Sequence, residues 1–293
     1  MAFDAFDAEE AVRAIDELGT GSTSGATVFL SRIVEIVESG ATRLDALEHF
    51  IVGAATVPPE IVERADALGI KATRCYGSSE HPTVTLSAPG DPLWTRAHTD
   101  GPPLPGNEVR IVDDEGRDVG TGQVGEIATR GPELFVGYLD PSLNELAFFD
   151  DGWFRTGDVG RLEDGCLVVT DRKKDIIIRG GENISASEVE AVLERRDEVL
   201  ESAVVAMDDE ALGERVCAFV VLREGTSLGI DSVRSHFVGA GLARQKTPER
   251  LVIIDALPRT ASGKIQKEHL RRRLREEPPA DAVTRTPVDP PSP

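Results

Sequence analysis

A strand–helix–strand run between residues 49 and 76 is the feature that most constrains the fold. Residues 49–55 are largely apolar and end in small side chains, and residues 71–76 form a second short strand-like run. Between them we predict a helix from Pro58 to Leu68, because proline is favourable in the first turn of a helix. Two strands joined by a helix are the unit of a parallel sheet. The sequence therefore predicts an α/β fold.

The pattern changes at about residue 99. Short β-rich runs at residues 109–112 and 124–129 alternate with Asp-Gly and Glu-Gly turns, which indicates a small antiparallel β unit. The expected divisions are residues 1–98, part of a large N-terminal α/β domain; 99–171, a β subdomain; 172–275, a compact, mobile α+β domain; and 276–293, a disordered tail with six of the eighteen prolines.

Charge and composition exclude several classes of protein. The 293 residues include 52 acidic and 32 basic side chains, a net charge of −20, which argues against a nucleic-acid partner. Apolar stretches reach only about seven residues, where a membrane-spanning helix needs about twenty. Acidic residues stand where a signal peptide needs a basic and then an apolar segment, so we expect a cytoplasmic protein. Three cysteines without a CxxC pair argue against a disulfide framework or a zinc site.

Two polar motifs could bind a nucleotide. Tyr76-Gly-Ser-Ser-Glu80 follows a predicted strand, where parallel sheets bind ligands, and its carboxylate could hold Mg²⁺. Asp158 follows a Thr-Gly turn and could accept hydrogen bonds from ribose hydroxyls. Taken alone, each motif is more often an ordinary surface loop or turn.

Three further motifs carry charge or glycine. Residues 171–175 hold five charges, which usually form a solvated face, and a Gly180-Gly181 pair follows. Lys264, in a Ser-Gly-Lys loop, could deliver a positive charge to a phosphoryl transition state, although most such loops are plain surface. Residues 21–25 look like a phosphate loop but lack its lysine. We predict a flexible turn between two helices there.

The order of these motifs resembles the acyl- and aryl-CoA synthetases of the adenylate-forming superfamily, which includes luciferase and the adenylation domains of peptide synthetases. The resemblance extends over about residues 4–275. The segments that carry it are Tyr76-Gly-Ser-Ser-Glu80, Asp100-Gly-Pro-Pro-Leu-Pro-Gly106, Gly131-Pro-Glu-Leu-Phe-Val-Gly-Tyr138, Trp153-Phe-Arg-Thr-Gly-Asp158, Asp171-Arg-Lys-Lys-Asp175, Gly180-Gly-Glu-Asn-Ile184 and Arg259-Thr-Ala-Ser-Gly-Lys264.

The resemblance implies a site for ATP or AMP and Mg²⁺. Its residues are expected to be Tyr76 on adenine, Gly77 beside it, Gly53, Ala54 and Ala55 along the nucleotide pocket, Ser79 at the α-phosphate, Glu80 on Mg²⁺, and Asp158 with Arg172 at the ribose. It also implies moving parts. Lys264 resembles the adenylation lysine, Lys174 the hinge between two half-reactions, and Gly180 with Gly181 the turn along the CoA pantetheine channel.

One element of the family pattern is missing. The family has a Ser/Thr/Gly-rich loop ending in lysine well upstream of the Tyr-Gly motif, and this sequence has no equivalent. We therefore expect the C-terminal half of a carboxylic acid:CoA ligase, an acid-thiol ligase that takes CoA as substrate, with a missing N-terminal half or a partner chain. An exposed apolar surface on residues 1–95 is also expected. The alternatives are a non-catalytic nucleotide-binding or interaction module, and an adenylation domain that serves a carrier protein.

Overall fold

The chain forms two compact units in the computed structural model, Met1–Val169 and Thr170–Pro293. The structure describes residues 6–40, 42, 44–53, 56–260, 263–276 and 283–285. The boundary between the units along the chain lies two residues before the predicted boundary, which was between residues 171 and 172. None of the helices among the described residues is long and apolar enough to cross a membrane.

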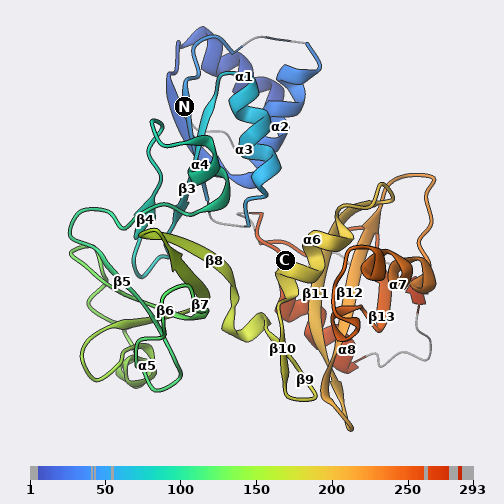
Figure 1. Ribbon diagram of the computed structural model, residues 1–293. Coiled ribbons are helices and arrows are strands. Elements are labelled where there is room, and N and C mark those ends of the chain that lie inside the picture. The colour runs from blue at the N-terminus through green and yellow to red at the C-terminus, as the bar shows by residue number, and fades with distance from the viewer. Residues whose placement is uncertain are drawn as a thin grey trace. The chain divides into compact units, whose positions relative to one another are not determined.

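The first unit begins with an α/β sheet (Figure 1). Its strand order is β1 (Ser22–Ala26), β2 (His49–Gly53), β3 (Lys71–Tyr76) and β4 (Thr85–Leu86), and the first three strands are parallel. Its helices are α1 (Ala8–Glu17), α2 (Thr27–Glu38), α3 (Pro59–Ala67) and α4 (Leu93–His98). One apolar core joins α1, α2 and α3 to β2 and β3, so the strand–helix–strand prediction for residues 49–76 is confirmed.

The predicted turn at residues 21–25 is wrong, because four of these residues belong to β1, a strand that pairs in parallel with β2. Serine and glycine have low strand propensity, and the pairing partner lies 27 residues further along the chain. Gly25 has a packing role. A Cβ atom there would lie 2.9 Å from the Phe29 ring and 3.3 Å from the Phe50 ring.

A second, antiparallel sheet completes the first unit, as the turn-rich sequence predicts. Its order is β5 (Glu108–Val112), β6 (Gly125–Arg130), β7 (Phe154–Glu163) and β8 (Cys166–Arg172). The short helix α5 (Pro141–Ala147) lies between β6 and β7 in the chain, and the Asp140 side chain caps it by accepting a hydrogen bond from Ser142 N.

A buried ion pair joins the two sheets of this unit. Arg74 on β3 donates to Asp100 Oδ1 from Nε and Nη2, at 3.0 and 2.8 Å. The other carboxylate oxygen accepts from Val169 N on β8 at 2.9 Å. Burial raises the pKa of Asp100, and Arg74 opposes that shift. Because Arg74 precedes Tyr76 by two residues, this pair fixes the end of β3 against β8.

The second unit is a sheet with helices on both faces. Its strand order is β10 (Glu182–Ile184), β9 (Ile177–Arg179), β12 (Gly213–Leu222), β13 (Arg250–Ile253) and β14 (Val283–Arg285), and β11 (Val199–Asp209) also pairs with β12. Alternate residues of the long strands face opposite sides. One face packs on α6 (Ala186–Leu193) and α7 (Ile230–Gly239), and the other on α8 (Lys267–Glu276).

The expectation of a disordered tail from residue 276 onward is contradicted at Val283–Arg285, which pairs in parallel with β13. Residues 277–282 and 286–293 lie outside the described part. The strand was missed because its partner is remote in sequence and proline-rich surroundings indicate a loop.

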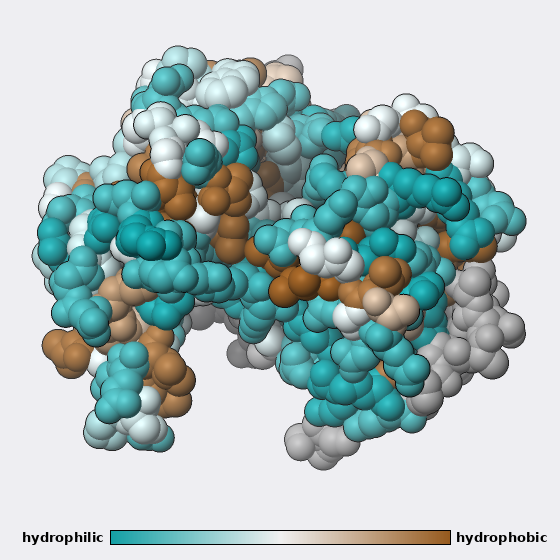
Figure 2. Space-filling model, turned by 60° about the horizontal axis from the view of Figure 1, so that its bottom comes forward, coloured by the Kyte–Doolittle hydropathy of each residue, from teal (hydrophilic) through white to brown (hydrophobic). Residues whose placement is uncertain are grey.

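Large apolar side chains are exposed at several places in the first unit. In the described part of residues 1–95 they are Phe6, Leu18, Val28, Leu93 and Trp94. The most exposed apolar residues of the described chain, however, are Val136 and Leu139, with Leu143 and Leu146 of α5 close by in sequence. Figure 2 shows brown apolar residues at its lower left, the side on which α5 lies in Figure 1.

We predict that R74M lowers the free energy of unfolding of the first unit by about 3 kcal/mol or more, because it leaves the Asp100 carboxylate buried without its cation. Both tryptophans, Trp94 and Trp153, lie in this unit, so urea unfolding followed by their fluorescence measures it. R117M is the matched control, since the Arg117 side chain is 72% exposed and its ion pairs contribute little. Equal unfolding midpoints for R74M and wild type would contradict the role given to the pair.

Candidate active site

Tyr76 and Asp158, 82 residues apart in the chain, meet at the carboxyl end of β3. The Tyr76 hydroxyl donates to Asp158 Oδ2 at 2.8 Å. The tyrosine ring packs against an apolar cluster of Ile111, Ile127 and Leu167, and Asp158 is buried. Ligands of parallel sheets bind at this end of the strands. The fold therefore places an aromatic ring and a carboxylate together where a nucleoside can bind.

A sharp turn within β7 presents Asp158. Gly157 has a φ of 69°, a left-handed conformation that favours glycine. Asp158 N donates to Thr156 Oγ1 at 3.1 Å, and the same hydroxyl donates to Ile127 O on β6 at 2.7 Å. The Thr-Gly-Asp sequence thus forms a hydrogen-bonded turn, which fixes the main chain that carries the Asp158 carboxylate.

The loop after β3 folds tightly over its own backbone. A Cβ atom on Gly77 would lie only 1.9 Å from Pro82 O, so this position requires glycine. Ser78 N donates to His81 O at 2.9 Å, and His81 N donates to Ser78 Oγ at 3.2 Å. Ser79, the predicted phosphate contact, is exposed at the outer edge of this loop.

His81 supports the loop that follows β3, and the sequence did not predict it as a site residue. Its ring is fully buried, with Nδ1 at 3.0 Å from Thr129 Oγ1 and Nε2 at 3.3 Å from Asn107 Oδ1. Asn107 Nδ2 donates to Thr83 O, so its oxygen faces the ring, and these partners assign the proton to Nε2. Burial lowers the pKa of His81, which favours this neutral form.

Glu80 is held by the segment that follows β6. Tyr138 Oη donates to Glu80 Oε1 at 2.9 Å, and Phe135 N donates to Glu80 O at 2.8 Å. Among the described residues no group of three or more His, Cys, Asp or Glu side chains could hold a metal ion. A single carboxylate still fits Mg²⁺, because in nucleotide sites this ion takes one or two carboxylates and completes its shell with phosphates and water.

The nucleotide pocket wall that we predicted is only partly described. Gly53 ends β2, and a Cβ atom there would lie 2.6 Å from Cys75 Sγ on the neighbouring strand, so glycine permits this close approach. Ala54 and Ala55 lie outside the described residues.

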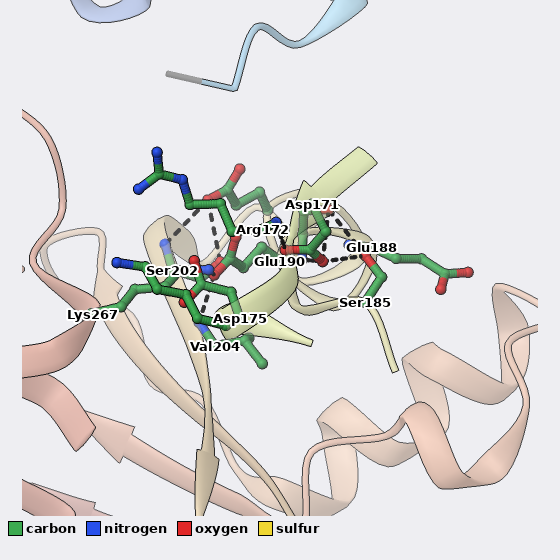
Figure 3. A network of polar contacts seen from close by, with 12 residues as sticks. Asp171, Arg172, Asp175, Ser185, Glu188, Glu190, Ser202, Val204 and Lys267 are labelled. Carbon is green, nitrogen blue, oxygen red and sulfur yellow. Dashed lines mark hydrogen bonds and ion pairs between the residues drawn. The ribbon is translucent and has the colours of Figure 1, made fainter. Parts of the chain in front are cut away.

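The predicted hinge segment lies at the start of the second unit. Lys174 is exposed in a short 3-10 helix, Lys173–Asp175, and Arg172 directly precedes this helix. Arg271 of α8 donates to Lys174 O at 3.0 Å and pairs with the Asp175 carboxylate. Asp171 Oδ2 accepts from Ser185 Oγ, which caps α6, at 2.8 Å (Figure 3). Contacts on both sides of Lys174 therefore tie this segment to the second unit.

Gly180 and Gly181 form the two-residue turn between β9 and β10. Their φ angles are 58° and 87°, and Arg179 pairs with Glu182 across the turn. Two successive positive φ values define a type I′ hairpin, which favours glycine at both positions. The pair is exposed, so a thin ligand could approach its backbone closely.

Lys264 lies three residues before the start of α8. Arg259 bridges to Ile265, Thr260 N donates to Lys264 O at 2.9 Å, and Lys264 N donates to Thr260 Oγ1 at 3.1 Å. The Lys264 side chain is exposed. These contacts join Lys264 to Thr260, and the exposed ammonium group stands at the end of a long side chain.

A partly buried acidic cluster contacts the helix that follows Lys264. Lys267, the first residue of α8, pairs with Glu190 of α6 at 2.8 Å, and Glu190 also accepts from Val204 N (Figure 3). Burial raises the pKa of Glu190 to about 7, while Lys267 acts to lower it. The neighbouring Glu194 accepts from Ser202, and burial also raises its pKa. The cluster fixes where α8 begins.

The structure thus gathers the predicted residues into two groups. Tyr76, Gly77, Ser79, Glu80 and Asp158 lie together in the first unit. Arg172, Lys174, Gly180, Gly181 and Lys264 lie in the second unit.

Comparisons with known proteins agree with this division. A family model described as AMP-binding enzyme matches residues 1–139, and one described as AMP-binding enzyme C-terminal domain matches residues 188–264. The chain therefore belongs to the AMP-binding, adenylate-forming enzyme family, and the resemblance to its acyl-CoA synthetases is confirmed.

Particular relatives are longer than this chain. It is 43% identical over 254 residues to the medium-chain fatty-acid–CoA ligase of Escherichia coli, covering 85% of this chain and 44% of the ligase. ATP-bound MatB from Rhodopseudomonas palustris matches with a TM-score of 0.84 and 28% identity, covering 92% of this chain and 54% of that one. The O-succinylbenzoate coenzyme A synthetase of Bacillus subtilis, in complex with ATP and magnesium ion, matches with a TM-score of 0.78, 29% identity and coverages of 92% and 54%. The chain spans about half the length of these relatives.

We predict that Glu190 destabilises the second unit increasingly as the pH rises. Its pKa is raised to about 7 from an ordinary 4.5, so its stabilising contribution is complete below pH 4.5 and is lost as the pH rises toward 7. The free energy of unfolding of E190Q, compared with that of wild type, should therefore increase by about 3 kcal/mol when the pH is raised from 5 to 8.

Urea unfolding followed by circular dichroism measures this difference, with tryptophan fluorescence reporting the first unit separately. E188Q, an exposed position on the same helix, serves as the control and should show no comparable trend. A pH-independent difference between E190Q and wild type would show that Glu190 does not titrate in this range.

Proposed function

We propose that these residues belong to an AMP-forming carboxylic acid:CoA ligase, which activates a carboxylate with ATP and then transfers the acyl group to CoA. The observation that carries the proposal is the contact between Tyr76 and Asp158, which joins an aromatic ring to a buried carboxylate at the ligand-binding end of a parallel sheet. The family membership and the names of the relatives support it. Because those relatives are about twice as long, the activity is proposed for a protein with every part of the site.

In the first half-reaction an oxygen of the substrate carboxylate attacks the α-phosphorus of ATP. A phosphorus–oxygen bond forms to the acid, and the bond to the leaving pyrophosphate breaks. Tyr76 would stack on adenine, Asp158 would bind the ribose hydroxyls with Arg172 assisting, and Ser79 would contact the α-phosphate. Negative charge grows on phosphate oxygens, and the ammonium group of Lys264 would stabilise it. Mg²⁺ held by Glu80 would supply further neutralising charge.

In the second half-reaction the CoA thiol loses its proton to water, and its sulfur attacks the acyl carbon. The carbon–sulfur bond of the thioester forms, the bond between the acyl carbon and the phosphate oxygen breaks, and AMP leaves with the electrons of that bond. Lys264 has to leave the site so that the thiol can reach the adenylate. Rotation about Lys174 would remove Lys264 and bring the exposed Gly180-Gly181 turn to the pantetheine arm. Such a hinge motion gates turnover in many enzymes. A glycine turn suits this role because it has no side chain to obstruct the channel.

We expect K264A to reduce carboxylate-dependent exchange between ATP and pyrophosphate by a factor of about one hundred or more, as is typical when a group that stabilises transition-state charge is lost. The assay uses a panel of aliphatic and aromatic acids with this chain, and with this chain joined to the N-terminal half of a relative. K246A is the control, because Lys246 pairs with Glu188 on the surface of the same unit.

Unchanged exchange in K264A would refute the role of Lys264. AMP binding by wild type without exchange in either form would favour the non-catalytic nucleotide-binding module.

A further inference from the structure

Tyr138 contacts Glu80, which lies 58 residues earlier in the sequence. Its hydroxyl donates to Glu80 Oε1 at 2.9 Å. We propose that Tyr138 is a positioning residue, which holds the Glu80 carboxylate in the orientation that a nucleotide-bound divalent cation requires, and that Asn144 of α5 holds Tyr138. This inference rests on the proposed function, because it assigns Glu80 to the cation.

Asn144 brackets the backbone of Tyr138 from both sides. Asn144 Oδ1 accepts from Tyr138 N at 2.7 Å, and Asn144 Nδ2 donates to Tyr138 O at 3.3 Å. Gly137 makes room for this contact, since a Cβ atom there would lie 3.0 Å from Asn144 Oδ1, and its φ of 137° favours glycine. The helix that carries Asn144 is capped by Asp140. A short helix thus fixes the main chain from which the tyrosine extends.

Aromatic packing fixes the ring of Tyr138 as well. Phe135 meets it edge to face, with ring centroids 4.9 Å apart, and Phe135 stacks on Phe148 and contacts Phe154 in turn. Phe135 N also donates to Glu80 O. One segment therefore holds Glu80 at two points, through its main chain and through its carboxylate.

Of the two contacts that this segment makes with Glu80, only the hydrogen bond from the Tyr138 hydroxyl concerns the carboxylate. Removing the Tyr138 hydroxyl leaves the ring packing and the Phe135 contact in place. A glutamate side chain that loses an orienting hydrogen bond gains rotamer freedom, and ordering it upon cation binding costs free energy. Hydrogen bonds that orient a metal-ligating carboxylate typically change metal affinity by a factor of ten to one hundred. The hydroxyl should therefore influence cation binding and leave metal-free nucleotide binding unchanged.

The test compares Y138F, N144A and wild type in two titrations. Mn²⁺ affinity is measured by electron paramagnetic resonance in the presence of saturating ATP, and AMP affinity is measured calorimetrically in EDTA. We expect Mn²⁺ to bind about tenfold more weakly to Y138F, and more weakly to N144A as well, with AMP affinity unchanged in both. S142A is the control on the same helix, because its hydroxyl contacts Asp140 and not Tyr138.

Wild-type Mn²⁺ affinity in both Y138F and N144A would overturn the inference. An equal loss of Mn²⁺ and AMP affinity would also overturn it, because that result indicates general damage to the site. Should wild type itself bind neither AMP nor Mn²⁺ with ATP, the proposed function fails, and the assignment of Glu80 and Tyr138 fails with it. N144A keeps the test decisive if Y138F does not fold.

Discussion

The buried ion pair between Arg74 and Asp100 is the interaction on which the candidate nucleotide site depends. It links the parallel sheet, through β3, to the antiparallel sheet, through β8. Tyr76 comes from the first sheet and Asp158 from the second, so their contact requires the two sheets to keep a fixed register. A buried pair of this kind adds little net stability compared with apolar packing, but its loss is costly. Its role here is to align Tyr76 with Asp158, which lie 82 positions apart in the sequence.

The other residues of the site are held by contacts that differ in kind. The loop after β3 is supported by a buried neutral histidine, His81, and by the segment around Tyr138. In the second unit, Lys264 N donates to Thr260 Oγ1, and the helix after Lys264 starts at a partly buried pair between Lys267 and Glu190. Exposed candidate side chains thus stand next to buried or partly buried polar contacts.

Local patterns in the sequence predicted much of the fold. The strands at residues 49–53 and 71–76 and the helix after Pro58 follow from apolar runs and proline placement. The ordered motifs identified the family, which the comparisons confirm. Contacts between distant residues were not predictable in this way. β1 lacks strand-forming side chains and forms through pairing with β2, while His81 and Tyr138 gain their roles from partners 26 to 58 residues away.

The most direct test of the account is a calorimetric titration of AMP into wild type and D158N. The account predicts that D158N binds AMP about tenfold or more weakly, because a hydrogen bond to a charged group contributes about 1.5–3 kcal/mol and Asn keeps only part of it. D164N is the control, since Asp164 is exposed and its φ of 48° also suits asparagine. Equal AMP affinity in D158N and wild type would contradict the assignment of the nucleotide site.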